Sequence, residues 1–413
     1  MLAQTLRIKI AKWLDEYVGR ALIALVHSLR LGKRGTNHQT TRARLLVIKF
    51  WGMGSIILLE PALRLLRERF PQARIDFLTL AQNRELFALL PHVDRVHVLD
   101  FLRPLRFLSQ AVRMLVRLRQ QRYDVIYDAE FFANFSALLA RLSAPQTLAG
   151  FSRPQGRKRD LLDLAVPFHD DEHAAQNFLR LIMAEPNAPE KRAALPSLHD
   201  VSPRLQLAAP TRARFETQYL VMNVNASPLA LERRWPRENF AQLARWLLRA
   251  YEIELVLIGN AAERNYTQRL AEAINAAGRV RNLAGALSLC ELAGLIQGAA
   301  LFISNDSGPL HLAAALQKPV VGFYGPETPK RFGPLCERRL IFYLGLPCSP
   351  CMSVDNAKTV NCTNHLRCMR ELRAIEVIPP LQRFISQHEL LPLREARSYD
   401  ETTTPIGASP YAV

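Results

Sequence analysis

The sequence predicts an α/β protein of two domains, each built on a doubly wound parallel sheet. Buried strands alternate with helical patterns in two successive series, and such alternation produces parallel sheets with right-handed crossovers. Residues 185–215 are rich in Pro, Ala and Arg, separate the two series, and are interpreted as an interdomain linker. The length of 413 residues agrees with two domains.

The first series begins with residues 44–50, whose apolar and β-branched run is typical of a buried strand. Gly52 and Gly54 follow, and apolar residues at helical spacing then run from Ile56 to Leu66. Further strands are expected at residues 75–79, 96–99 and 125–127, with a helix at about residues 105–121.

The second series begins with a strand at residues 219–224 and ends with one at residues 319–324. Ser288 and Glu291 form a capping box, which predicts the start of a helix at residue 289. The elements expected in between are strands at 255–259 and 301–304 and helices at 240–251, 262–277, 289–299 and 308–316. Such domains bind ligands at the carboxyl ends of their strands, so we expect the ligand in a central cleft between them.

The composition limits the classes of partner. The formal net charge of +17, from 54 Lys+Arg against 37 Asp+Glu, favours phosphorylated substrates or an anionic lipid surface. Basic clusters such as residues 153–159 lack any zinc-finger or RNP-type motif, so no nucleic acid partner is expected. No export signal is visible, so the six cysteines are expected to be free thiols in a reducing cytoplasm.

The first 40 residues contain a helical pattern with an apolar stripe. The apolar run at residues 21–26 is too short to span a membrane, which takes ~20 residues. The stripe consists of Leu6, Ile10, Trp13, Leu14, Tyr17, Ala21 and Leu25. Arg7, Lys9, Lys12 and Arg20 lie largely off it. Two interpretations remain open: an amphipathic helix at an anionic membrane surface, and a helix that packs on its own domain or on a partner.

The segment 301–312 carries the sharpest chemical signal. A buried strand runs into Asn-Asp-Ser-Gly-Pro and then into a helix, which Asp306 or Ser307 is expected to cap. Gly308 lets a ligand approach the backbone closely, and the first N–H groups of the helix favour an anion such as a diphosphate. His311 lies one turn into the helix, in position to donate to a phosphate oxygen.

Together with residues 318–334, this segment resembles the signature of the heptosyltransferase-like glycosyltransferases, family 9 of the inverting enzymes with the GT-B fold. In that family an Asp-Ser/Thr-Gly-x-x-His motif and a Phe-Gly-Pro-Thr-x-Pro turn form the donor site. Here the turn at residues 324–329 reads Tyr-Gly-Pro-Glu-Thr-Pro, so Glu327 stands where the family has Thr.

The resemblance covers residues 44–375 and implies further donor-site residues. Residues 232–240 are similar to the family's Lys-x-Trp-Pro segment, and Arg233 takes the place of the phosphate-binding Lys. Residues 257–264 resemble the family's Gly-Gly-x-x-Glu segment, in which Glu263 matches the ribose-binding Glu. The alternative interpretation is that Arg233 is simply part of a basic cluster on the protein surface.

The N-terminal half departs from the family at the presumed general base. Residues 49–56 resemble the family's Met-Gly-Asp loop, but Ser55 replaces the Asp, and serine is no base at neutral pH unaided. Asp128-Ala129-Glu130 resembles the family's Asp-x-Gln, with Glu130 replacing Gln. Three accounts stay open: Glu130 or Asp128 acts as base, electrostatic help alone suffices, or the protein is inactive.

Two other motifs are weaker. His173 resembles a family histidine at the start of a helix, where capping is an equal alternative. The spacing of the C-terminal cysteines allows a four-thiolate zinc site, and the alternative is a loop of free thiols. The four cysteines are Cys348, Cys351, Cys362 and Cys368.

The resemblance implies metal-independent transfer of a sugar, with ADP-heptose as typical donor and no cofactor. The acceptor would be a lipid-linked saccharide of the lipopolysaccharide core, at the cytoplasmic face of the inner membrane, with the enzyme peripheral on it. The expected layout is an amphipathic helix and linker at 1–40, an acceptor domain at 41–200, a nucleotide-sugar domain at 215–375, a C-terminal helix packing back at 376–395, and a disordered tail at 396–413.

Two other functions remain as alternatives. A non-catalytic sugar-nucleotide-binding relative would keep the donor site and lack the base, as Ser55 suggests. A nicotinamide-dependent oxidoreductase is disfavoured, because Gly52 and Gly54 are followed by Ile57 where its fingerprint requires a third glycine.

Overall fold

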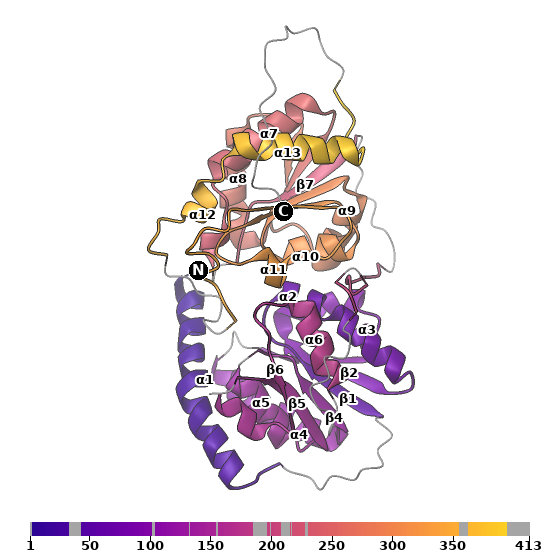
Figure 1. Ribbon diagram of the computed structural model, residues 1–413, viewed down its shortest axis with the longest axis vertical. Helices are drawn as coiled ribbons and strands as arrows, with labels where there is room; N and C mark the ends of the chain where they lie inside the picture. Colours follow the sequence, from indigo (N-terminus) through magenta and orange to yellow (C-terminus); the bar gives the residue numbers. More distant parts are fainter. Residues whose placement is uncertain are drawn as a thin grey trace. The chain divides into compact units, whose positions relative to one another are not determined.

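The computed structural model describes two compact units, Met1–Gln206 and Leu207–Val413, here called unit 1 and unit 2 (Figure 1). The boundary falls inside the segment expected as the linker. The described residues are 2–32, 43–100, 104–131, 133–153, 156–184, 196–198, 200–207, 215, 217–227, 230–354 and 362–394, with the backbone alone at 2–14 and 104–106. Residues 33–40 of the segment predicted as helix and linker lie outside these residues, as does the whole tail predicted at 396–413.

Unit 1 contains one parallel sheet in the order β3-β2-β1-β4-β5-β6. Its strands are β1 (Arg44–Ile48), β2 (Arg74–Leu80), β3 (Arg95–Leu99), β4 (Val125–Asp128), β5 (Thr147–Ser152) and β6 (Leu164–Pro167). The order reverses between β1 and β4, so the carboxyl ends of these two strands lie at a switch point. β5 and β6 were not predicted, because neither strand has a long apolar run.

The helices of unit 1 cover both faces of this sheet. They are α1 (Leu2–Ser28), α2 (Met53–Leu58), α3 (Glu60–Arg69), η1 (Ala81–Leu89), α4 (Pro104–Gln121), α5 (Asn134–Leu142), η2 (Arg157–Leu161) and α6 (Ala174–Met183). The helical pattern predicted from Ile56 to Leu66 is interrupted at Leu59. Pro61 explains the break, since it has no N–H and is best accommodated in the first turn of a new helix.

Helix α1 packs on α5 and η2 through one face. Ile23 and Val26 are buried there, and the Asp15 carboxylate accepts from the backbone N–H groups of Asn134 and Phe135 at 3.0 and 2.7 Å, which caps α5. The apolar stripe predicted from the sequence lies on the opposite face of α1, where Tyr17, Ala21 and Leu25 are exposed. Among the described helices, none is both long enough and apolar enough to cross a bilayer.

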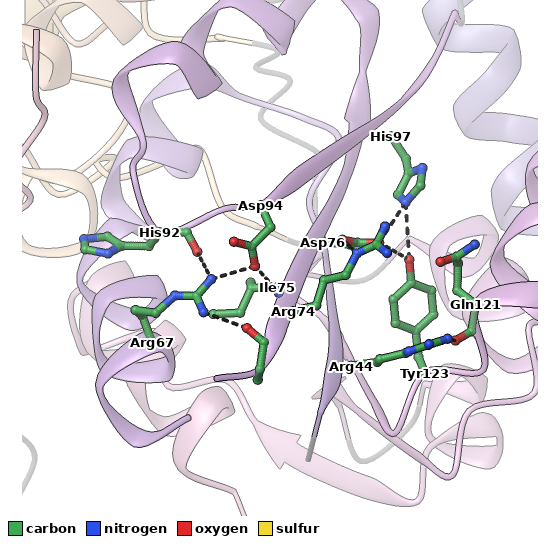
Figure 2. Close-up of polar contacts among 11 residues, drawn as sticks. Arg44, Arg67, Arg74, Ile75, Asp76, His92, Asp94, His97, Gln121 and Tyr123 are labelled. Carbon is green, nitrogen blue, oxygen red and sulfur yellow. Dashed lines mark hydrogen bonds and ion pairs between the residues drawn. The ribbon is translucent and has the colours of Figure 1, made fainter. Parts of the chain in front are cut away.

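A buried polar cluster lies toward the amino ends of β2 and β3 (Figure 2). The Asp76 carboxylate accepts from Tyr123 Oη at 2.6 Å and from Arg74 Nε at 2.9 Å, and lies 3.1 Å from His97 Nε2. Burial raises the pKa of the Asp76 carboxyl, but the hydrogen bonds of its three partners outweigh this and hold the pKa below its usual value of 3.8. The cluster therefore stabilises the sheet at the edge away from the glycine loop.

Unit 2 repeats the architecture with a parallel sheet in the order β12-β11-β10-β7-β8-β9. Its strands are β7 (Tyr219–Asn223), β8 (Glu254–Ile258), β9 (Val280–Asn282), β10 (Leu301–Asn305), β11 (Val320–Tyr324) and β12 (Arg339–Tyr343). The switch point lies between β7 and β10. Two strands were not predicted: β9, which has three residues of mixed polarity, and β12, although four of its five residues are apolar.

The helices of unit 2 match most of the predicted positions, and the capping box of Ser288 and Glu291 is confirmed. They are η3 (Leu231–Arg233), α7 (Arg237–Ala250), η4 (Ala261–Glu263), α8 (Arg264–Ile274), α9 (Leu289–Gly298), α10 (Gly308–Ala315), α11 (Pro329–Phe332), α12 (Arg367–Arg370) and α13 (Ala374–Gln387). Trp235 stacks on Phe323 and donates from Nε1 to the Leu372 carbonyl, which ties the segment before α7 to the C-terminal segment. Helix α13 packs on α7.

Candidate active site

The switch point of unit 2 holds the start of α10. β10 ends at Asn305, and Ser307 occupies the N-cap position of α10 with extended backbone. Its hydroxyl lies 2.8 Å from Ser304 Oγ and accepts from Asn223 Nδ2 at 3.0 Å, so the side chain is held toward the sheet.

The prediction of a side-chain cap on α10 is not met at Ser307, which occupies the N-cap position but whose side chain makes no cap hydrogen bond. The N–H groups of its first turn have no helical acceptor, and the helix dipole adds positive potential at the same point. The arrangement suits an anion that approaches along the carboxyl edge of the sheet.

Arg233 lies at this edge, but in the described structure it is engaged by protein groups. Its Nη1 is 3.2 Å from Asp306 Oδ2, and its Nε is 3.3 Å from Met352 Sδ. All three side chains are buried. The sequence thus placed Arg233 beside the Asp306 motif as expected, and missed both the ion pair between them and the contact with Met352.

A second buried ion pair joins the turn after β11 to the same loop. Glu327 Oε1 lies 3.2 Å from Arg331 Nη1 and accepts from the Thr328 N–H, and Arg331 donates to the Met352 carbonyl. Glu327, the departure from the family's Thr, therefore fixes the turn through Arg331. Sequence reasoning missed Arg331, although an acid and a base four residues apart at the start of a helix are a recognisable signal.

His311 is buried within α10, and Tyr324 is buried at the end of the neighbouring strand β11. Burial, the Asp306 charge and the Glu327 charge raise the pKa of the Tyr324 hydroxyl well above its usual value, and its Oη donates to the Phe332 carbonyl at 2.9 Å. Tyr324 is therefore a neutral structural donor.

Glu263 lies at the carboxyl end of β8, the strand beside β7. Its Oε2 accepts from the Asn260 N–H at 2.9 Å, and its Oε1 is 3.8 Å from Arg234 Nη2. Burial raises the pKa of the Glu263 carboxyl. Arg234 stacks over the Tyr266 ring at 4.3 Å and was missed by the sequence analysis, although it adjoins Arg233.

The switch point of unit 1 holds the glycine loop after β1. Glu130 enters this loop from the end of β4, and its Oε1 accepts from the N–H groups of Phe50 and Trp51 at 2.5 and 2.9 Å. Its Oε2 lies 3.1 Å from Lys49 Nζ, and both side chains are buried. The carboxylate is therefore an anchor of the loop, held on both oxygens.

Ser55 lies in the first turn of α2, beyond Gly52. Gly52 has φ of +85°, in the left-handed region, and a Cβ there would lie 3.2 Å from Ser55 Oγ. Ser55 is buried. The loop thus requires glycine at residue 52 and holds Ser55 at its inner side.

Asp128 is fully buried behind the loop. Its carboxylate lies 2.9 Å from Lys158 Nζ and accepts from Ser136 Oγ at 2.9 Å. Burial raises the pKa of the Asp128 carboxyl, and the Lys158 charge opposes this. Lys158 also donates to the Glu130 carbonyl at 2.7 Å. Residues 153–159 were predicted only as a basic cluster, and the burial of Lys158 was not foreseen.

The two weaker motifs, His173 and the C-terminal cysteines, have different outcomes in the structure. The His173 ring accepts from the Ala175 N–H at 3.2 Å and caps α6, so the capping alternative is confirmed. Within the described part of the chain, no three His, Cys, Asp or Glu side chains lie close enough to hold a metal ion. None of Cys348, Cys351, Cys362 and Cys368 forms a disulfide, and the zinc site stays a prediction.

Known proteins resemble this chain in sequence. A family model, glycosyltransferase family 9 (heptosyltransferase), matches residues 111–360. Lipopolysaccharide heptosyltransferase 2 of Salmonella typhimurium is 26% identical over 309 residues, or 73% of this chain and 88% of the relative. Lipopolysaccharide heptosyltransferase 1 of Pseudomonas aeruginosa is 29% identical over 322 residues, or 75% of this chain and 86% of the relative.

Solved structures show the same fold. The structure of ADP-heptose lps heptosyltransferase II of E. coli has a TM-score of 0.66 at 22% identity, covering 84% of this chain and 99% of that chain. E. coli heptosyltransferase WaaC with ADP-2-deoxy-2-fluoro heptose has a TM-score of 0.59 at 19% identity, covering 84% and 99%. These similarities confirm the predicted α/β architecture of the GT-B type.

Proposed function

The chain belongs to glycosyltransferase family 9, and on that basis we propose that it transfers a sugar from a nucleotide-diphosphate donor to a lipopolysaccharide-core acceptor, with inversion. The names of its relatives support heptose as the sugar. ADP-heptose is the proposed donor, since one related structure holds ADP-2-deoxy-2-fluoro heptose. The observation that carries the proposal is the uncapped start of α10 beside Arg233.

The diphosphate is proposed to bind at the first N–H groups of α10. Negative charge grows on the diphosphate as the sugar leaves, and donors already in place stabilise that charge without rearrangement. Arg233 needs only to turn from Asp306 toward the phosphates, because the two groups already meet at this point. The helix dipole adds to the positive potential and His311 is proposed to donate to a phosphate oxygen, so no divalent metal is required in the proposal.

Glu263 is proposed to bind the ribose hydroxyls of the donor. One of its oxygens is fixed by the Asn260 N–H, while Arg234 is the weaker partner of the other at 3.8 Å. A hydroxyl can displace such a distant partner at small cost, because an ion pair at this distance contributes little.

The proton of the acceptor hydroxyl is the open step of the chemistry. Glu130 and Asp128 each face a buried lysine, and Glu130 Oε1 already accepts two N–H bonds. We therefore favour departure of the diphosphate as the driving event over a general base at either residue. Glu130 then orients the loop that carries Ser55.

The acceptor is proposed to be lipid-linked, with the enzyme on the cytoplasmic face of the inner membrane and peripheral to it. The charge of +17 supports attraction to an anionic lipid surface.

The decisive experiment measures ADP binding and heptose transfer. Calorimetric titration with ADP should give saturable binding, and Arg233→Gln should weaken it roughly 10- to 100-fold, as for loss of a charge-assisted bond. Arg249→Gln is the matched control, because Arg249 is exposed on α7. Transfer from ADP-heptose to a heptose-free lipopolysaccharide core should depend on Arg233 in the same way. Absence of nucleotide binding by the intact protein refutes the proposal.

A non-catalytic sugar-nucleotide-binding protein is the second candidate. It is favoured by Ser55 and by the engagement of both neighbouring carboxylates. In that case ADP would bind with the same Arg233 dependence, and no transfer would be detected with any acceptor.

A further inference from the structure

We propose that unit 1 docks on an anionic lipid bilayer through an exposed apolar surface shared by α1 and α4. This α1/α4 surface consists of Val18, Leu22 and Leu25 of α1 and Leu108, Val112 and Val116 of α4. Their exposed fractions lie between 44 and 72%. The inference rests on the proposed function only for the lipid-linked acceptor that gives the docking its purpose.

The exposed side of α4 is unusual for a surface helix. Ala111, Met114 and Leu118 face the core, while Leu108, Val112 and Val116 form a second apolar row at i, i+4, i+8 spacing. A helix that only covers a sheet needs one apolar stripe, with polar residues opposite. The second row of α4 has no such role, so it indicates a partner.

The two apolar rows belong to helices that both pack on α5. On α1, His27 bonds the Asp160 carbonyl of η2 on one flank, and Leu22 lies on the opposite flank. On α4, Gln110 bonds the Asp100 N–H beyond β3 on one flank, and Val112 lies on the opposite flank. Since α1 and α4 both pack on α5, the two exposed apolar rows belong to helices on the same side of unit 1.

The charge around this surface selects an anionic occupant. Helix α4 contains four arginines and no Asp or Glu. Arg113 and Arg117 are exposed and lie beside the apolar row. Apolar side chains flanked by arginines are the features of a helix in a bilayer interface, where the arginines meet phosphate headgroups. A symmetric contact with a second copy would instead bring the two arginine rows together, which is unfavourable.

The test is co-sedimentation of the full chain with vesicles. Vesicles of phosphatidylcholine with about 30% phosphatidylglycerol should bind the protein, and raising NaCl from about 0.05 to about 0.5 M should release most of it. The triple variant Leu108→Ser, Val112→Ser, Val116→Ser should lower the partition coefficient roughly 10-fold or more. Arg113→Gln with Arg117→Gln should lower it roughly 25-fold, at about 5-fold per charge.

Ile375→Ser is the matched control, because Ile375 is 56% exposed on α13 of unit 2. It should leave vesicle binding unchanged, and all variants should keep the wild-type unfolding temperature. Equal binding of the triple variant and the control would overturn the proposal. The proposal would also be overturned if the protein did not bind vesicles and instead formed a dimer in sedimentation velocity that the triple variant abolished.

The experiment separates this inference from the proposed function. Transfer to a water-soluble core saccharide should be unchanged in the triple variant, while transfer to acceptor embedded in vesicles should fall in proportion to binding. Vesicle binding without any transfer would leave the docking surface standing and refute the enzyme. Transfer without vesicle binding would refute the docking surface alone.

Discussion

Replacing Glu130 by Gln tests whether this residue anchors the glycine loop or accepts a proton. The amide can still accept the Phe50 and Trp51 N–H bonds through its oxygen, so the loop keeps these contacts. What is lost is the charge 3.1 Å from Lys49 Nζ, whose side chain is only 1% exposed. Removing one partner of a buried ion pair leaves an uncompensated charge and costs about 3–5 kcal/mol.

The expected readout is a large loss of stability in unit 1. For a unit of this size, 1 kcal/mol corresponds to roughly 2–4 °C, so the calorimetric transition should fall by roughly 6–20 °C. Lys49→Met combined with Glu130→Gln should recover much of the loss, because no buried charge then remains unpaired. Glu68→Gln on α3 is the matched control, since Glu68 is exposed.

A general base would give a different result. Glu130→Gln would then lower kcat by roughly 10²- to 10⁴-fold and leave the unfolding temperature close to that of the Glu68→Gln control. That outcome would refute the assignment of Glu130 as a loop anchor.

Three further changes probe the fold and the site. Asp76→Asn should abolish a pH-dependent part of the stability. Because the pKa of Asp76 is depressed in the folded state, its carboxylate stabilises the fold at pH values above its usual pKa of 3.8, and this contribution is lost as the pH falls through the folded-state pKa. Urea titrations at pH 7 and pH 3 would reveal the difference. Gly52→Ala should cost about 1–2 kcal/mol in denaturant unfolding, because φ at residue 52 is +85°. Ser55→Asp with Glu130→Gln restores the family pattern and should raise kcat at least about 10-fold if a base at residue 55 contributes; an unchanged kcat would show that the base is dispensable.

The fold was largely predictable because each sheet has apolar central strands. β1 contains an apolar run at residues 45–48 and β10 one at residues 301–303, whereas the edge strand β9 is short and mixed in polarity, and β6 is exposed in part. Residues near the donor motif were also predictable, since Arg233 and Asp306 do meet. Their mutual pairing was not, because a sequence shows which residues carry charge but not which opposite charge lies nearest after folding.

The pairing of Lys49 with Glu130 and of Lys158 with Asp128 was likewise not predictable from the sequence. These pairs determine how the replacement of the family's Asp by Ser55 is interpreted. The chain lacks a carboxylate at residue 55 and gains one at Glu130, so the formal charge of the loop region is kept. The chemistry is not kept, because a base must be open to the hydroxyl it deprotonates, and Glu130 is held by Lys49 and two backbone N–H groups. The two replacements therefore compensate in formal charge, but in the proposed mechanism not in proton transfer. In the proposed mechanism, rate enhancement therefore comes chiefly from the leaving-group side, where Arg233 and the start of α10 lie.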